Sequence, residues 1–205
     1  MTLADRLNKI IDEQGLTKRA FAKTLGVSEN YIYQLTGSQE KLTTISETLA
    51  KLIALEFGYD KDKIGIMGSS AGGHLASTAA THFNDNCRPD FQILFYPVIS
   101  MDISICHKGS RERLIGKNPT EELIRLYSNE LQVTEHTPPA FIMHSSDDRT
   151  VPVENSIRYY QALIKNKIPV SLHCYPIGGH GWGYNDSFKY KRQWTGELEK
   201  WLQEL

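Results

Sequence analysis

Hydrophobic and polar positions follow two different patterns along the chain. Residues 1–58 show helical spacing only, as in MTLADRLNKIIDEQ, where the apolar side chains fall on one stripe. From Lys63 onward, short apolar runs alternate with helical stretches, in the order IGIMG, FQILFYP, AFIMHSS and VSLHCYP. Such alternation is typical of a parallel sheet with crossover helices. We therefore predict an all-helical unit over 1–58 and an α/β unit with about four mostly parallel strands over 59–205.

The first unit predicts four helices separated by short turns. Thr17 can cap a second helix that Gly26 ends, and Ser28 can cap a third, SENYIYQLTG. Residues 44–57, TISETLAKLIALEF, predict a fourth helix with one apolar side. The segment 17–36 therefore has the spacing of a DNA-reading helix-turn-helix, with an exposed polar second helix.

Residues 1–59 resemble the phage-repressor (lambda repressor and Cro-like) family in the residue types at small, turn and core positions. The matching positions are Ala22, Gly26, Val27, Ile32, Ile53, Phe57 and Gly58. The resemblance implies contacts to DNA phosphates and to base edges, where amide side chains suit adenine. By this resemblance, Lys18 and Arg19 would contact phosphates and Asn30, Tyr31 and Gln34 would face base edges. Together with Ser28, these are the residues expected to face DNA.

Charge weakens the DNA-binding interpretation. Residues 1–58 carry seven basic and seven acidic side chains, and the exposed helix contains Glu29 but no Lys or Arg. Phosphate contacts supply most non-specific affinity, so a neutral unit is expected to bind duplex DNA weakly as a monomer. The whole chain is also balanced, with 23 basic and 24 acidic residues, which favours small neutral partners as much as nucleic acid.

The second unit contains a nucleophile motif, GSSAG, that fits GxSxG between an apolar strand and a small-residue helix. Ser70 occupies its central position, and the backbone N–H of Ala71 is the expected oxyanion donor. A serine needs a base, and the base needs an acidic partner. AFIMHSSDDRTVP places Asp147 and Asp148 after one apolar run, and VSLHCYPIGGHGWG places His180 after the next. Strand ends of a parallel sheet assemble on one side, so these residues can meet.

Three stretches carry a second resemblance: IGIMGSSAGGHLAS, the long segment from HKGSRERL to VPVENS, and GGHGWG. Through them, residues from about 58 to 205 are similar to the carboxyl-terminal part of acetyl-xylan-esterase-like α/β-hydrolases, the acetyl esterase and lipase group. The family pattern takes the acid four residues before the proline at Pro152, which selects Asp148 over Asp147. The resemblance implies deacetylation of small acyl esters, such as acetylated sugars or xylan fragments, by an acyl-enzyme route without a metal or organic cofactor.

The same resemblance raises a structural problem. Members of the family place several strands and a His-Gly-Gly loop, which gives a second oxyanion N–H, before the nucleophile strand. Residues 1–58 show neither, so we expect IGIMG to form a sheet edge, which favours a homodimer or internal covering. We also expect weak esterase activity, because loss of one oxyanion donor costs about 100 to 1,000-fold in rate. The alternatives are a DNA-binding regulator whose hydrolase half dimerises or senses a ligand, and an inactive natural or engineered chimera.

The remaining chemistry-bearing residues predict structural roles. We expect His144 to close its strand, Asp147 to be a loop acid or a hydrogen-bonding neighbour of the triad, and Trp182 to form a pocket wall. Residues 105–130 are expected to form a solvated helical cap over the sheet. The other histidines expected to be structural or on the surface are His74, His82, His107, His136 and His173.

Cysteine spacing and the amino terminus bear on location. Cys87, Cys106 and Cys174 are odd in number and lack CxxC spacing, which argues against a disulfide framework or zinc site and favours a reducing cytoplasm. The charged amino terminus does not read as a signal peptide, and no apolar run reaches membrane-spanning length.

Overall fold

The computed structural model describes residues 3–37, 53, 58, 60, 63–84 and 87–205. The chain divides into two compact units, Met1–Ile64 and Gly65–Leu205. The boundary predicted at residues 58 and 59 falls among positions that are only partly described, so it stays a prediction.

The described helices of the first unit are α1 (Leu3–Glu13), α2 (Lys18–Thr24) and α3 (Glu29–Thr36). Both predicted caps are present: the Thr17 hydroxyl accepts from the Ala20 N–H and the Ser28 hydroxyl from the Tyr31 N–H. Gly26 ends the α2 turn at φ 66°, a left-handed conformation that favours glycine. These helices share an apolar core formed by Leu7, Ile11, Phe21, Ala22, Leu25, Ile32, Leu35 and Ile53. Apart from Ile53, the predicted helix over 44–57 lies outside the described residues.

The second unit is built on a four-stranded sheet in the order β1-β2-β3-β4, with every neighbouring pair parallel. The strands are β1 (Gly65–Ser69), β2 (Phe91–Phe95), β3 (Ala140–Ser145) and β4 (Val170–Tyr175). They coincide with the four apolar runs in the sequence, so the prediction of about four parallel strands is confirmed.

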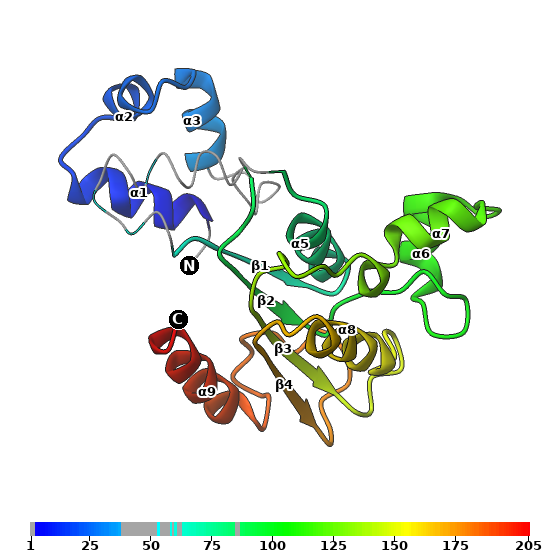
Figure 1. Ribbon diagram of the computed structural model, residues 1–205. Helices are drawn as coiled ribbons and strands as arrows, with labels where there is room; N and C mark the ends of the chain where they lie inside the picture. The colour runs from blue at the N-terminus through cyan, green and yellow to red at the C-terminus, as the bar shows by residue number, and fades with distance from the viewer. Residues whose placement is uncertain (1–2, 38–52, 54–57, 59, 61–62, 85–86) are drawn as a thin grey trace. The chain divides into compact units, whose positions relative to one another are not determined.

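Helices cover both faces of this sheet (Figure 1). On one face, α5 (Ala71–Thr81) and α8 (Glu154–Lys165) pack over side chains such as Leu94 and Ile142. On the other face, α9 (Lys191–Gln203) packs Trp194 against the cluster that contains Phe95, Phe141 and Met143. Successive side chains of β3 therefore point to opposite layers, and all six are buried, as a central parallel strand requires.

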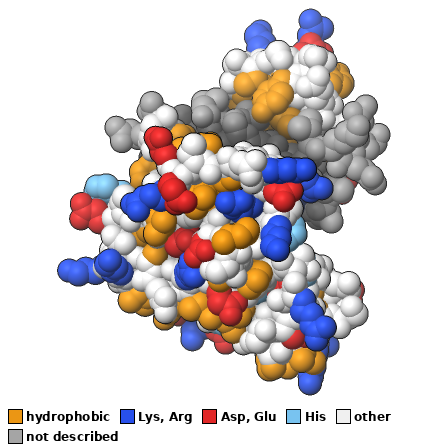
Figure 2. Space-filling view, turned by 90° about the vertical axis from the view of Figure 1, so that its right-hand side faces the viewer, with side chains coloured by type: hydrophobic (Ala, Val, Ile, Leu, Met, Phe, Trp, Pro, Cys, Tyr) orange, Lys and Arg blue, Asp and Glu red, His pale blue; other side chains and the backbone are white. Residues whose placement is uncertain are grey.

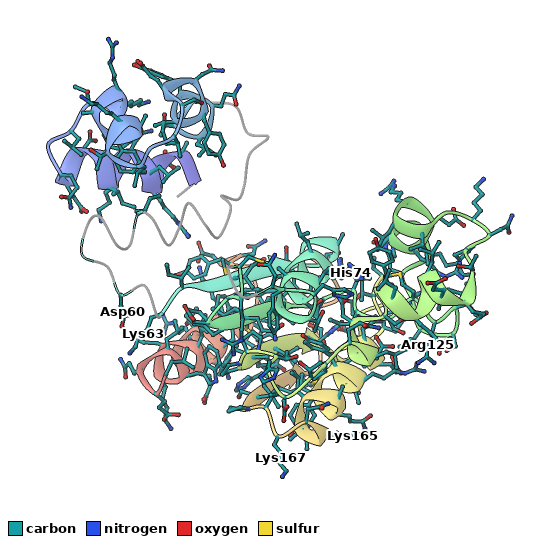
Figure 3. All side chains as sticks on the ribbon, turned by 45° about the horizontal axis from the view of Figure 1, so that its top comes forward. Asp60, Lys63, His74, Arg125, Lys165 and Lys167 are labelled. Atoms are coloured by element: carbon teal, nitrogen blue, oxygen red, sulfur yellow. The ribbon has the colours of Figure 1, made fainter. Side chains whose placement is uncertain are left out.

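The segment between β2 and β3 is helical, as predicted, with α6 (Lys108–Ile115), α7 (Glu121–Tyr127) and the 3₁₀ turn η1 (Asn129–Leu131), and its position as a cap over the sheet stays a prediction. An apolar cluster that includes Met101, Ile115 and Val151 anchors it. His74 on α5, labelled in Figure 3, also holds this segment in place, because its Nε2 lies 2.8 Å from the Tyr127 carbonyl oxygen. On the face drawn in Figure 2, acidic and basic side chains are interspersed with hydrophobic ones.

Strand β1 lies at one end of the described sheet, as predicted. Its residues alternate between exposed and half-buried, and the Met67 side chain is 52% exposed. Among the described residues, β1 therefore has one hydrogen-bonded neighbour, β2, and the candidate nucleophile Ser70 follows the carboxyl end of β1.

Candidate active site

Ser70 stands alone between β1 and α5, in a strained turn. Its backbone has φ 55° and ψ −122°, a region that non-glycine residues seldom occupy. Three hydrogen bonds hold it: the Ser70 N–H donates to the Phe95 carbonyl, and the Ser70 carbonyl accepts from the N–H groups of His74 and Val98. The surrounding backbone thus fixes the angle at which the hydroxyl is presented.

A glycine at position 68 makes this turn sterically feasible. A Cβ added at Gly68 would lie 2.1 Å from the Gly72 carbonyl oxygen and 2.8 Å from the Gly73 nitrogen. The close approach of β1 to the first turn of α5 therefore excludes any side chain there. Ala71 is the first residue of α5, and the first amide groups of a helix have no partner within it, so its N–H is available to a developing oxyanion.

The structure brings Ser70, Asp148 and His180 together in a hydrogen-bonded row. His180 Nε2 lies 2.8 Å from Ser70 Oγ, and His180 Nδ1 lies 2.6 Å from Asp148 Oδ2. Asp148 follows β3 and His180 follows β4, so both lie at the carboxyl ends of parallel strands, as Ser70 does. The Asp148 side chain is fully buried, and that of His180 is 19% exposed.

The Asp148 carboxylate is saturated with donors. Oδ1 accepts from the N–H groups of Thr150 at 2.8 Å and Val151 at 2.9 Å. Oδ2 faces His180 and, at 3.3 Å, Nε2 of His144. Burial alone would raise the pKa of Asp148, but the hydrogen bonds from these four residues together lower it below its ordinary value.

An ionised Asp148 determines the proton positions in the row. The carboxylate has no hydrogen to give, so His180 Nδ1 carries the proton of the 2.6 Å contact. In neutral His180 the lone pair therefore lies on Nε2 and faces the Ser70 hydroxyl. This is the arrangement in which an imidazole can take a proton from serine.

Three contacts from Asp147 and Tyr96 hold the His180 loop in place. Asp147 Oδ1 accepts from the Gly179 N–H at 2.8 Å, so Asp147 is a hydrogen-bonding neighbour of the triad rather than a member of it. The Tyr96 ring lies 4.7 Å from the His180 ring, and the Tyr96 hydroxyl accepts from the Gly183 N–H at 3.0 Å. Tyr96 has φ 35°, a further strained position at the end of a strand.

Trp182 braces the same loop from inside the core. Its side chain is buried, stacks on Phe188 at 4.0 Å and donates from Nε1 to Ser145 Oγ at 2.9 Å. Aromatic packing therefore accounts for the position of Trp182, and its role as a pocket wall stays a prediction.

Sequence reasoning missed two residues at the site, Tyr96 and His144. Tyr96 follows the apolar run FQILF directly, and that position at the carboxyl end of a strand was the available signal. His144 reads as a strand-closing core residue, and it is fully buried in β3, but its Nε2 faces the Asp148 carboxylate. Residues four positions apart are neighbours on a helix, but His144 lies in a strand and Asp148 in the loop after it, so their spacing did not predict this contact.

The predicted DNA-facing residues of the first unit are only partly available. Ser28 is exposed, but its hydroxyl caps α3, and Tyr31 is half-buried against the core, so Tyr31 does not face outward as expected. Arg19 Nε lies 3.4 Å from the Glu29 carboxylate, which offsets its charge.

Of the other three predicted residues, two are exposed and one is half-buried. Asn30 and Gln34 are exposed on α3, four residues apart and therefore on one face. Lys18 is half-buried, with Nζ 5.7 Å from the centre of the Tyr33 ring.

The described residues offer neither a metal-ligand cluster nor a membrane-spanning helix. Within the described ranges, no group of three His, Cys, Asp or Glu side chains could hold a metal ion. None of the helices in the part of the chain that the structure describes is long and apolar enough to cross a membrane. The three cysteines are free thiols.

Known proteins with similar sequence include an acetylxylan esterase and a xylanase. An acetylxylan esterase from Xylanibacter ruminicola is 46% identical over 146 residues, which is 69% of this chain and 30% of that protein. Endo-1,4-beta-xylanase B from Butyrivibrio fibrisolvens is 40% identical over 139 residues, which is 62% of this chain and 22% of that protein.

A solved structure of a related hydrolase is also similar to this chain. The acetyl ester-xyloside bifunctional hydrolase from Caldicellulosiruptor lactoaceticus superposes with a TM-score of 0.73 at 40% identity, covering 77% of this chain and 62% of that one. The chain thus spans less than two thirds of each of these three relatives. None of them bears on the phage-repressor resemblance of residues 1–59, which stays a prediction.

A family model matches a longer stretch than any of these relatives. The prolyl oligopeptidase family model covers residues 32–205, beginning within α3 and continuing through the whole sheet. The match includes the Ser70 turn and the loops that carry Asp148 and His180. Its extent over most of the chain, together with the α/β-hydrolase-like sheet and the esterase relatives, shows that this protein belongs to the prolyl oligopeptidase family.

Proposed function

We propose that the chain is a serine esterase that removes acetyl groups from small esters, with acetylated carbohydrates as its substrate class. The observation that carries the proposal is the row Ser70, His180 and Asp148, joined by contacts of 2.8 and 2.6 Å. The relatives named as an acetylxylan esterase and an acetyl ester hydrolase supply the substrate class.

In the proposed reaction, His180 takes the proton of the Ser70 hydroxyl while Oγ attacks the carbonyl carbon of the ester. The tetrahedral oxyanion accepts a hydrogen bond from the Ala71 N–H, and His180 then returns the proton to the departing alcohol. His180 then deprotonates a water that attacks the acetyl-serine, and when the C–Oγ bond breaks, His180 returns this proton to Ser70 Oγ and acetic acid leaves, ionising to acetate. Asp148 keeps His180 in the reactive tautomer and stabilises its charged form in both steps.

We expect the rate to be low. Among the described residues, the Ala71 N–H is the oxyanion donor that the turn itself supplies. In other hydrolases, removal of one oxyanion donor lowers kcat by about 100 to 1,000-fold.

Hydrolysis of p-nitrophenyl acetate tests the proposal. The purified chain should release p-nitrophenol faster than the Ser70→Ala variant at the same concentration, after correction for the buffer rate. Equal rates for the two proteins would remove the esterase proposal. Acetylated xylo-oligosaccharides, with acetate as the measured product, then test the substrate class.

Duplex DNA binding by the first unit is the second candidate function. The observation that favours it is the pair Asn30 and Gln34, exposed on one face of the capped helix α3. Binding should weaken steeply with salt and be lost in the double variant Asn30→Ala with Gln34→Ala. Absence of binding at low salt would exclude it.

A further inference from the structure

His144 is a fully buried histidine with a polar contact at each ring nitrogen. Nδ1 lies 2.7 Å from Ser156 Oγ, on α8, and Nε2 lies 2.9 Å from the Val151 carbonyl oxygen. Nε2 also lies 3.3 Å from Asp148 Oδ2. His144 therefore connects the β3 strand, the α8 helix and the acidic loop that follows β3.

The proton on His144 can be placed from these contacts. The Val151 carbonyl can only accept, so Nε2 must carry a hydrogen to lie 2.9 Å from it. That hydrogen also points toward the Asp148 carboxylate, which is a second acceptor for the same donor. Nδ1 is then unprotonated and accepts a hydrogen bond from the Ser156 hydroxyl, and this bond fixes the plane of the ring.

The Asp148 carboxylate is consequently held at both oxygens. Backbone N–H groups of Thr150 and Val151 hold Oδ1, and the two imidazoles of His144 and His180 flank Oδ2. Rotation of the carboxylate would break contacts on both sides at once. The buried donor from His144 therefore restricts Asp148 to the orientation that meets His180 Nδ1.

We propose that His144 is a positioning residue for the catalytic row: it orients the Asp148 carboxylate that in turn orients His180. This inference rests on the esterase function proposed for the same site. A purely structural histidine would need only Ser156 and Val151 as partners, and the contact to Oδ2 is what distinguishes the two roles.

Two variants of the full chain separate these roles. In His144→Gln, the amide nitrogen can reach the place of ring Nε2 and donate to Val151 and Asp148. In His144→Asn, the shorter amide ends near the place of Nδ1, so it can meet Ser156 but not Asp148. The pair differs by one methylene and keeps a polar group in the same buried space.

The first measurement is the proton resonance of His180 Nδ1, which reports the 2.6 Å contact to Asp148 without any need for catalysis. We expect the resonance to stay near the wild-type position in His144→Gln and to move or disappear in His144→Asn. The second is hydrolysis of p-nitrophenyl acetate, with kcat and KM measured separately. We expect kcat to fall about tenfold in His144→Asn with KM little changed, and to recover to within about threefold of the wild type in His144→Gln.

Thermal unfolding midpoints show whether each variant is folded. If His144→Asn does not fold, His144→Gln still decides, because a folded His144→Gln variant with a displaced His180 resonance would overturn the inference. Two folded variants with the same His180 resonance and the same kcat would overturn it as well. Equal hydrolysis by the wild type and Ser70→Ala would instead remove the esterase proposal, and the His180 resonance would still judge the role of His144.

Discussion

Replacing Asp148 with asparagine should abolish most of the esterase activity while leaving the chain folded. The amide oxygen of the new side chain would take the place of Oδ1, because the N–H groups of Thr150 and Val151 need an acceptor there. The amide NH₂ would then face His180 Nδ1 at the 2.6 Å contact, donor against donor. His180 relieves this by moving its proton to Nε2, and it can then no longer accept the Ser70 proton.

The expected loss is large because the base is in the wrong tautomer. The same change in a serine protease triad lowers kcat by about 10,000-fold, equivalent to about 5.5 kcal/mol in the barrier. The assay is kcat for p-nitrophenyl acetate, with unfolding by denaturant as a check on the fold. Asp147→Asn is the matched control, since its amide oxygen can still accept from the Gly179 N–H. We expect Asp147→Asn to keep kcat within about twofold. A folded Asp148→Asn variant within tenfold of the wild type would refute the proposed role.

Two further predictions concern stability. Gly68→Ala should lower the free energy of unfolding by about 1 to 3 kcal/mol, because its Cβ would lie 2.1 Å from the Gly72 carbonyl oxygen. Gly72→Ala is the control and should not lower it, because no atom outside its own helix backbone and chain neighbours lies within 4 Å of the new Cβ. Equal denaturant midpoints for the two variants would contradict this prediction. The hydrogen bonds from Ser104, and then Arg158, lower the pKa of Asp102 from 3.8 to about 2. The carboxylate therefore contributes stability above pH 3.8 that is lost as the pH falls toward 2. Unfolding measured across this range should show a weaker pH dependence in Asp102→Asn, and an unchanged dependence would be inconsistent with the assignment.

Local patterns were sufficient to predict the sheet and the turn at Ser70. All four strands are short apolar runs of the kind typical of parallel sheets, so they could be found without knowledge of their partners. The GSSAG motif needs small residues for steric reasons that the structure bears out at Gly68. The capping residues Thr17 and Ser28 were also predictable from local sequence, because each cap hydrogen bond joins residues only three positions apart.

Contacts between distant segments could not be predicted in the same way. His144 appears as one polar residue in an apolar strand, and nothing in the sequence says that its Nε2 faces the following acidic loop. Trp182 was placed near His180 by sequence distance alone, but its ring turns inward to Phe188 and Ser145. Tyr31 has helical spacing that allows an outward position, yet it packs on the core. In each case side-chain direction depended on packing rather than on local pattern.

Activation of the Ser70 hydroxyl by His180 is the basis of the proposed esterase function. Mass spectrometry after reaction with a fluorophosphonate tests it most directly, because the reagent forms a stable bond only with an activated serine hydroxyl. We predict one adduct on the peptide that contains Ser70, absent in Ser70→Ala and formed far more slowly in His180→Ala. Absence of an adduct from the folded wild type, an adduct on another serine, or equal labelling in His180→Ala would contradict the account.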